Sequence, residues 1–265
     1  MDDSRGVALV TGASSGIGLE FARLLAQRGS NVLLVARSSE RLEEIARELA
    51  TSQSVETYVF TADLAQPEAR ERLLQFTRQR DLPVHLLVNN AGFGLLGKFH
   101  EIDWGDQAEL LRLNVEALVQ LTHMFLPDML ERGTGGVINI GSMAGFTPGP
   151  LQSTYYASKA FVISFTEGLA RELSGSGVTV TAVCPGPVPS GFQKRAGFSE
   201  SRRRIAAVSA SNVARIGLDG WARGRRVVIP GVVNKIIAVL LKFAPRRATA
   251  DSVYRIQVER MSGRK

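Results

Sequence analysis

The sequence contains a single cysteine, Cys184, so the chain cannot form an internal disulfide. Its three histidines, His85, His100 and His123, do not recur at the spacing of metal ligands, and we expect no metal site. No apolar run reaches the roughly 20 residues that a membrane-spanning helix needs. The acidic first residues lead straight into an apolar run, which predicts no signal peptide and a cytoplasmic protein.

The charge of the chain is unevenly distributed around a net value of +7. Residues 1–193 carry 15 Lys and Arg against 21 Asp and Glu, whereas residues 194–265 carry 17 against 4. The last part is therefore strongly basic. Such a split favours an acidic partner, such as lipid headgroups, nucleic acid or an acidic carrier, but a solvated basic surface explains it equally well. The basic charge is the only feature of the sequence that favours nucleic-acid binding, and it is not sufficient by itself. We therefore expect no nucleic-acid partner.

Apolar strand-like runs alternate with helix-like segments along the 265 residues. We expect strands at 7–11, 31–36, 55–61, 84–89, 135–141, 178–184 and 226–229, and helices at 17–28, 39–50, 67–80, 106–131, 155–174 and 211–223. Strands that are apolar without alternation are typical of a parallel sheet covered on both faces. The pattern predicts one α/β domain over 1–265, with a doubly wound, mostly parallel, seven-stranded sheet.

The first expected strand runs into a glycine-rich turn and then into a helix. Free backbone N–H groups and the helix dipole at such a turn attract an anion, most often a phosphate. Glycine lets the backbone approach the phosphate closely. We predict that this turn binds a phosphate-bearing cofactor through Gly12, Ser14, Ser15, Gly16, Ile17 and Gly18.

The same turn spells G-x-S-x-G, the pattern of the nucleophile elbow in α/β-hydrolases. In that alternative Ser14 is a nucleophile and one of the three histidines is its base. The hydrolase reading leaves Gly18 unexplained, and it assigns no role to the residues described next.

Three side chains form a candidate site for carbonyl chemistry. Tyr155 and Lys159 are four residues apart in an expected helix, so both side chains lie on one face. A free tyrosine has a pKa of about 10, and a nearby ammonium lowers it. Ser142 ends the fifth expected strand, where its hydroxyl is able to hydrogen-bond the same substrate oxygen. Together they provide a hydrogen-bond donor that polarises the substrate oxygen, an acid that protonates it, and a cation that adjusts the pKa of the acid.

Taken in order, these residues and several others resemble the short-chain dehydrogenase/reductase family. The matching motifs run from residue 11 to 186, and they are Thr11-Gly12-x-x-x-Gly16-x-Gly18, Asp63, Asn89-Asn90-Ala91-Gly92, Asn114, Ser142, Tyr155-x-x-x-Lys159 and Pro185-Gly186. The resemblance implies a single-domain Rossmann fold and an oxidoreductase that transfers a hydride between a nicotinamide cofactor and a ketone or secondary alcohol.

The resemblance also implies a role for each matching residue. Tyr155 is expected to be the general acid or base, and Lys159 to lower its pKa and bind the nicotinamide ribose. Ser142 is expected to orient the substrate oxygen. Asn114 is expected to hold a water that links Lys159 to solvent. The remaining implied cofactor contacts are Asp63 and Leu64 at the adenine, Asn90, Ala91 and Gly92 at its ribose, and Pro185, Gly186, Val188 and Ser190 around the nicotinamide.

The end of the second expected strand predicts which dinucleotide binds. An acidic residue there favours NAD, because it accepts hydrogen bonds from the free ribose hydroxyls. This strand ends in Ala36, and Arg37 follows. A guanidinium is able to pair with the extra phosphate of NADP, so we predict NADP(H) over NAD(H). Ser15 stands where a second basic residue is usual, which predicts a moderate preference.

The carboxyl-terminal part departs from the family pattern. We expect residues 187–210 to form a lid over the substrate, with Phe192 and Phe198 in its pocket. Residues 232–265 form a basic, apolar extension, in which Asn234, Lys235, Ala238 and Lys242 make a narrow polar strip on a helix. Docking of this segment on the domain or on a second subunit is one reading, and peripheral membrane contact through 232–247 is the other.

The expected partner is a small carbonyl or alcohol substrate, and a lipophilic ketone of steroid or acyl-thioester type is our hypothesis for it. In the family that the chain resembles, the helices at 106–131 and 155–174 usually pair across two-fold axes, which implies a homodimer or homotetramer. A non-catalytic dinucleotide-binding or scaffold protein is the alternative function. Such proteins commonly lose the tyrosine or lysine, and this chain keeps both.

Overall fold

Seven strands form one fully parallel sheet in the computed structural model, which describes residues 6–189 and 207–262. The strands are β1 (Val7–Thr11), β2 (Asn31–Ala36), β3 (Thr57–Thr61), β4 (Val84–Asn89), β5 (Gly135–Ile140), β6 (Val178–Val183) and β7 (Val227–Val228). Their order is β3-β2-β1-β4-β5-β6-β7, so the direction of winding reverses between β1 and β4. The predicted doubly wound sheet is confirmed.

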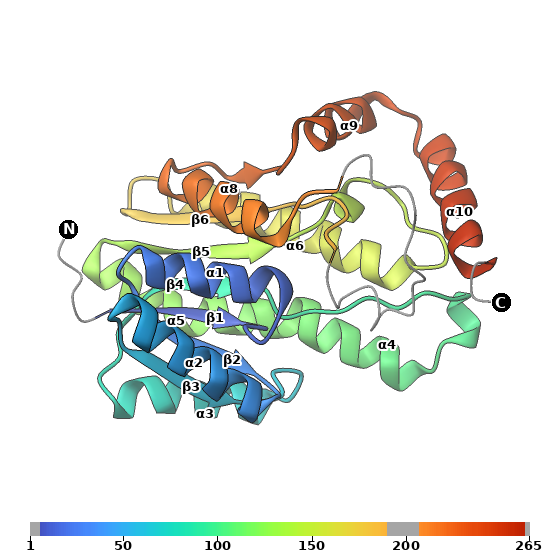
Figure 1. Ribbon diagram of the computed structural model, residues 1–265. Coiled ribbons are helices and arrows are strands. Elements are labelled where there is room, and N and C mark those ends of the chain that lie inside the picture. The colour runs from blue at the N-terminus through green and yellow to red at the C-terminus, as the bar shows by residue number, and fades with distance from the viewer. Residues whose placement is uncertain (1–5, 190–206, 263–265) are drawn as a thin grey trace.

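Two helical layers cover the sheet because alternate strand residues face opposite sides (Figure 1). Ala8 and Val10 of β1 join a core with the helices α1 (Gly16–Gln27), α2 (Ser39–Gln53) and α8 (Ala210–Ala222). Val7 and Leu9 face the other core, which the helices α3 (Pro67–Gln79), α5 (Leu118–Arg132) and α6 (Ser153–Glu172) complete. Every β1 residue is buried, which explains the uninterrupted apolar run in the sequence.

The helix expected at 106–131 is divided into three pieces. It consists of α4 (Trp104–Leu111), a π-helical segment η2 (Arg112–Ala117) and α5. A π-helical turn widens the helix by one residue per turn and is frequent at functional sites. It breaks the 3.6-residue spacing only locally, so the apolar pattern alone did not reveal it.

The basic extension forms two helices, α9 (Val232–Phe243) and α10 (Arg246–Ser262). The helix at 232–243 follows the predicted apolar pattern. We did not predict α10, because its apolar residues do not gather on one face at helical spacing. In Figure 1 both helices lie at the end of the domain where the carboxyl ends of the strands meet.

A buried polar network ties the central strands to the helices behind them. Asn89 Nδ2 on β4 donates to Asn139 Oδ1 on β5 at 3.0 Å and to Thr122 Oγ1 on α5 at 3.1 Å. Asn139 Nδ2 in turn donates to Thr166 Oγ1 on α6 at 3.0 Å. All four residues are buried, so each lost hydrogen bond leaves a desolvated partner.

Asn139→Ala is expected to lower the free energy of unfolding by about 1–3 kcal/mol, because the buried amide of Asn89 and the hydroxyl of Thr166 each lose a partner. Urea denaturation of the purified protein measures the change. Asn212→Ala removes an exposed amide from α8 and serves as the control. Equal stability losses in the two variants would contradict the structural role of the network.

Candidate functional site

A cavity of about 520 Å³ lies beyond the carboxyl ends of the central strands, where the strand order reverses. Most of the predicted site residues line it, and these are Gly12, Ser14, Ser15, Gly16, Ile17, Arg37, Asp63, Leu64, Asn90, Ala91, Gly92, Ser142, Tyr155, Lys159, Pro185, Gly186 and Val188. Gly18 and Asn114 are not among the described residues that line it. Ser190, Phe192, Phe198 and most of the predicted lid lie outside the described residues.

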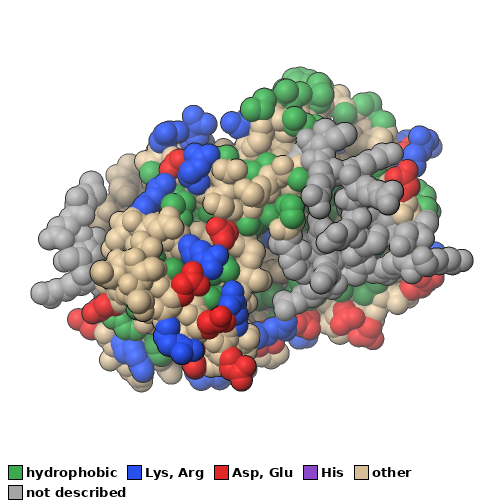
Figure 2. Space-filling model, viewed as in Figure 1, with side chains coloured by type: hydrophobic (Ala, Val, Ile, Leu, Met, Phe, Trp, Pro, Cys, Tyr) green, Lys and Arg blue, Asp and Glu red, His purple; other side chains and the backbone are tan. Residues whose placement is uncertain are grey.

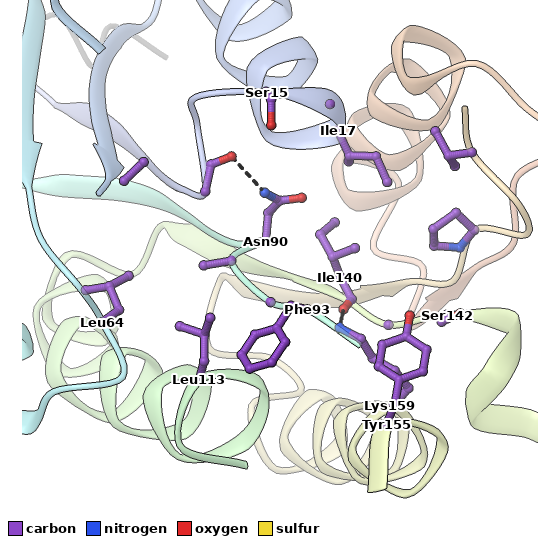
Figure 3. A pocket seen from close by; sticks show the side chains of 18 of the residues that line it. Ser15, Ile17, Leu64, Asn90, Phe93, Leu113, Ile140, Ser142, Tyr155 and Lys159 are labelled. Atoms are coloured by element: carbon purple, nitrogen blue, oxygen red, sulfur yellow. Dashed lines mark hydrogen bonds between the residues drawn. The ribbon is translucent and has the colours of Figure 1, made fainter. Parts of the chain in front are cut away.

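The glycine-rich turn is held by the side chain of Asn90. Asn90 Nδ2 donates to the carbonyl oxygens of Thr11 at 2.9 Å and Gly12 at 3.2 Å (Figure 3). A Cβ atom on Gly12 would lie 2.7 Å from Asn90 Nδ2, and one on Gly18 would lie 2.4 Å from it. Gly12 also has a φ of +64°, which side-chain-bearing residues rarely adopt. Glycine is therefore required at both positions for packing, and at position 12 for the backbone conformation as well.

The first turn of α1 is arranged to receive an anion. Ser15 is its N-cap residue, and the Ser15 side chain makes no capping hydrogen bond to the helix. No acidic residue lies in this first turn. The backbone N–H groups and the helix dipole therefore point into the cavity without a competing carboxylate. This arrangement fits the phosphates of a dinucleotide.

Three of the predicted catalytic side chains meet at the opposite end of the cavity. Tyr155 and Lys159 extend from α6, and Ser142 follows the carboxyl end of β5 and lies beside the Tyr155 hydroxyl (Figure 3), with which its side chain forms a hydrogen bond. Ser142 also caps a short helix η3 (Met143–Phe146), because its Oγ accepts from the N–H of Ala144 at 3.1 Å. That bond fixes the position of the Ser142 hydroxyl.

Burial controls the acidity of this pair. It raises the pKa of the Tyr155 phenol to about 12, while a hydrogen bond with Ser142 opposes the shift and the nearby Tyr156 adds to it. Burial also lowers the pKa of Lys159 to about 8, partly offset by Cys184. Tyr155 is therefore held in its protonated, proton-donating form.

Lys159 is held by the sheet rather than by the tyrosine. Its Nζ atom donates to the carbonyl oxygen of Ile140 at 2.8 Å and lies 5.9 Å from the centre of the Tyr155 ring (Figure 3). We expected Lys159 to lower the Tyr155 pKa, but in the structure burial raises this pKa instead.

Asn114 lies in the π-helical segment and is almost fully buried. Its amide accepts from the N–H of Phe93 at 3.1 Å and donates to the carbonyl oxygen of Phe93 at 2.9 Å and to Ser158 Oγ at 3.2 Å. A Cβ atom on Gly92 would lie 2.8 Å from Asn114 Oδ1 and 3.7 Å from Lys159 Nζ. Asn114 and Lys159 thus border the same glycine, and the water relay between them stays a prediction.

Several lining residues were not predicted from the sequence, among them Phe93, Leu113, Ile140, Met143, Gln152 and Tyr156. Gln152 and Tyr156 are linked to the unpredicted helix α10, because Gln257 Nε2 donates to Gln152 Oε1 at 2.8 Å and to the Tyr156 hydroxyl at 3.3 Å. Gln257 is buried, although it is more than 100 residues away in the chain. No local signal in the sequence indicates this contact.

Arg37 lies at the cavity with its guanidinium half-exposed, 3.6 Å from a carboxylate oxygen of Glu109 on α4. An exposed ion pair of this length is weak, so the guanidinium is available to a stronger anion. Glu109 had not been singled out, because it is 72 residues further along the chain.

The hydrolase alternative lacks a base. Ser14 lines the cavity, but none of the three histidines is among the described residues that line it. His100 is largely exposed, 77% for its side chain. The serine therefore belongs to the glycine-rich turn and not to a catalytic triad.

Comparisons with known proteins agree with this geometry. A family model described as short chain dehydrogenase matches residues 6–200. A very-long-chain 3-oxoacyl-CoA reductase of Anas platyrhynchos is 34% identical over 82% of this chain and 70% of its own. The solved structure of a Sphingobium yanoikuyae short-chain dehydrogenase in complex with NADPH is 34% identical, with a TM-score of 0.80 over 86% of this chain and 88% of that one. A 7β-hydroxysteroid dehydrogenase structure has a TM-score of 0.85 and 26% identity, over 94% of this chain and 96% of that one.

The lowered pKa of Lys159 predicts a pH-dependent change in stability. Between about pH 8 and 10, the unfolded chain binds more protons at this side chain than the folded chain does, so its contribution to stability becomes more favourable as pH rises. Relative to Lys159→Met, the parent is expected to gain about 2–3 kcal/mol between pH 7 and 10.

Denaturant titrations at several pH values measure this difference, with Lys235→Met on an exposed lysine as the control. A constant difference between the parent and Lys159→Met across that range would show that the ammonium is not desolvated.

Proposed function

The chain belongs to the short-chain dehydrogenase/reductase family, and from this premise we propose that it is an NADP(H)-dependent oxidoreductase acting on a ketone or secondary alcohol. One observation carries the proposal. One end of the cavity holds the protonated Tyr155 hydroxyl, the Lys159 ammonium and the Ser142 hydroxyl, which accepts a hydrogen bond from a backbone N–H. The other end is the glycine-rich turn, which is suited to bind phosphate.

Each of these side chains has a distinct task in carbonyl reduction. Ser142 donates a hydrogen bond that orients the carbonyl oxygen, and Tyr155 transfers its phenolic proton to that oxygen. Lys159 stabilises the phenolate that remains, because its ammonium is held nearby by Ile140. The nicotinamide, when bound, supplies the hydride for reduction and accepts it for oxidation. Burial keeps the phenol protonated at neutral pH, which is the form that carbonyl reduction requires.

Arg37 supports NADP(H) as the cofactor. It follows β2, at the position where the adenine ribose lies in dinucleotide-binding folds. Its weak pairing with Glu109 leaves the guanidinium free to take a 2′-phosphate. The Sphingobium yanoikuyae relative, which is described in complex with NADPH, supports the same cofactor.

A lipophilic carbonyl compound is the substrate that we propose. Two of the relatives described above act on a very-long-chain 3-oxoacyl-CoA and on a hydroxysteroid, according to their names. The wall near Tyr155 includes Met143, Tyr156 and Pro187, which offer apolar contact to such a molecule.

Tyr155→Phe is expected to lower kcat by about 10²- to 10⁴-fold in NADPH-dependent reduction, because the substrate oxygen loses its proton donor. The assay is a screen of aliphatic, steroid and acyl-thioester ketones that follows NADPH oxidation. Tyr156→Phe, one residue away, is the matched control and should retain far more activity. Binding of NADPH by Tyr155→Phe without any turnover by the parent would favour a non-catalytic dinucleotide-binding protein.

Arg37→Ala is expected to lower kcat/KM for NADPH by about 10- to 100-fold and to change the value for NADH little, because one charge-assisted hydrogen bond contributes about 1.5–3 kcal/mol. Glu109→Gln keeps the shape of the competing side chain and removes its charge, so it should leave the NADPH value unchanged or raise it. Steady-state kinetics with both cofactors test the pair. Equal use of NADH and NADPH by the parent would contradict NADP(H) specificity.

A further inference from the structure

Helix α9 presents an apolar face to solvent. Phe243 is 84% exposed, Val232 72% and Leu240 62%, whereas large hydrophobic side chains elsewhere in the domain are mostly buried. The complete exposed set on α9 is Val232, Val233, Ile236, Ile237, Val239, Leu240 and Phe243. In Figure 2 hydrophobic side chains gather at the top of the molecule, where Figure 1 shows α9.

The orientation of α9 is fixed by two residues of the predicted polar strip that face the domain, whereas Lys235 and Lys242 are exposed. Asn234 and Ala238 are buried, and Asn234 Nδ2 donates to the carbonyl oxygen of Pro230 at 2.8 Å. A Cβ atom on Gly186 would lie 2.5 Å from Asn234 Oδ1, so the helix fits closely on that glycine. The helix therefore docks on the body through its small and polar residues and turns its apolar residues outward.

The exposed apolar residues form one continuous surface. At 100° per residue, their directions span about 160° around the helix. Lys235 and Lys242 lie next to one edge of this arc, between the apolar face and the buried strip. Long basic side chains at that position reach an interface while the apolar face inserts beside them. Arg246 and Arg247 continue the basic edge just after Pro245, and both are exposed.

Charge distinguishes between the two most obvious occupants of this surface. Residues 232–247 contain four basic residues and no acidic one. In a two-fold contact between copies, the same patch meets itself and brings only further positive charge to these cations. An anionic lipid surface offers the opposite charge and an apolar interior together. No helix among the described residues has the length and apolar character to cross a bilayer, so α9 would lie in the plane of the interface.

We propose that α9, with Arg246 and Arg247, is a docking surface for anionic lipid membranes. The apolar residues enter the boundary between headgroups and acyl chains, and the basic residues pair with lipid phosphates. Because Asn234 packs against Gly186, which lines the cavity, this contact holds the cavity wall next to the bilayer. Membrane binding is independent of the proposed reaction and would stand if that reaction were disproved.

Vesicle flotation of the full-length protein tests the proposal without any enzymatic assay. Vesicles of phosphatidylcholine with phosphatidylserine are compared with pure phosphatidylcholine at low salt and at 1 M salt, where screening is strong. We expect binding to the anionic vesicles, and at least tenfold weaker binding to the neutral ones and at high salt.

Two variants separate the apolar and basic contributions. Leu240→Asp with Phe243→Asp, both exposed, should reduce flotation at least tenfold, and so should Lys242→Glu with Arg246→Glu. Arg41→Glu with Arg47→Glu makes the same charge change on α2 and should leave binding nearly unchanged. Circular dichroism and thermal melting establish that each variant is folded.

Three results would overturn the proposal. The first is the absence of flotation with anionic vesicles at low salt. The second is flotation that the α9 variants do not weaken. The third is a dimer in sedimentation experiments that dissociates in Leu240→Asp with Phe243→Asp, combined with no vesicle binding by the parent. That result would assign the face to a second copy of the chain.

Discussion

The hydrogen bonds between Asn90 and the first strand hold the sheet together at the point where its winding reverses. Asn90 Nδ2 binds the carbonyl oxygens of Thr11 and Gly12, while Thr11 Oγ1 accepts from the backbone N–H groups of Asn90 and Ala91. These contacts bring the loops after β1 and β4 so close that Gly12 and Gly18 have no room for a side chain. The glycine-rich turn and the loop after β4 are thereby fixed relative to one another.

Burial then sets the protonation states of the proposed catalytic pair. Removing Tyr155 and Lys159 from water disfavours the charged form of each, so the phenol keeps its proton and the amine loses its proton more readily. The Ile140 carbonyl oxygen and the Ser142 hydroxyl counter part of this cost through hydrogen bonds. A bound cofactor and substrate would change the balance further, because they replace the remaining water with fixed dipoles.

The sequence was sufficient for features that depend on local pattern. Buried parallel strands read as apolar runs, and the glycine turn, Tyr155 and Lys159 appear at strand ends or at helical spacing, so their meeting place followed from the parallel topology. Features that depend on distant contacts were not predictable in this way. The π-helical turn at Asn114 interrupts a pattern that otherwise continues, and the link from Gln257 to Gln152 joins segments about 100 residues apart.

The sequence predicted correctly that α9 is an amphipathic helix. The pattern did not show which side of the helix faces the domain. An apolar stripe on a helix usually marks the side that faces the core. Here the space beside Gly186 admits only a small or polar strip, and the amide of Asn234 finds a partner there in the Pro230 carbonyl oxygen. Local packing thus orients the helix with its apolar side toward solvent. This exposed side is bordered by lysines and arginines. Part of the basic charge in the last third of the chain therefore lies beside an exposed apolar surface, close to the wall of the cavity.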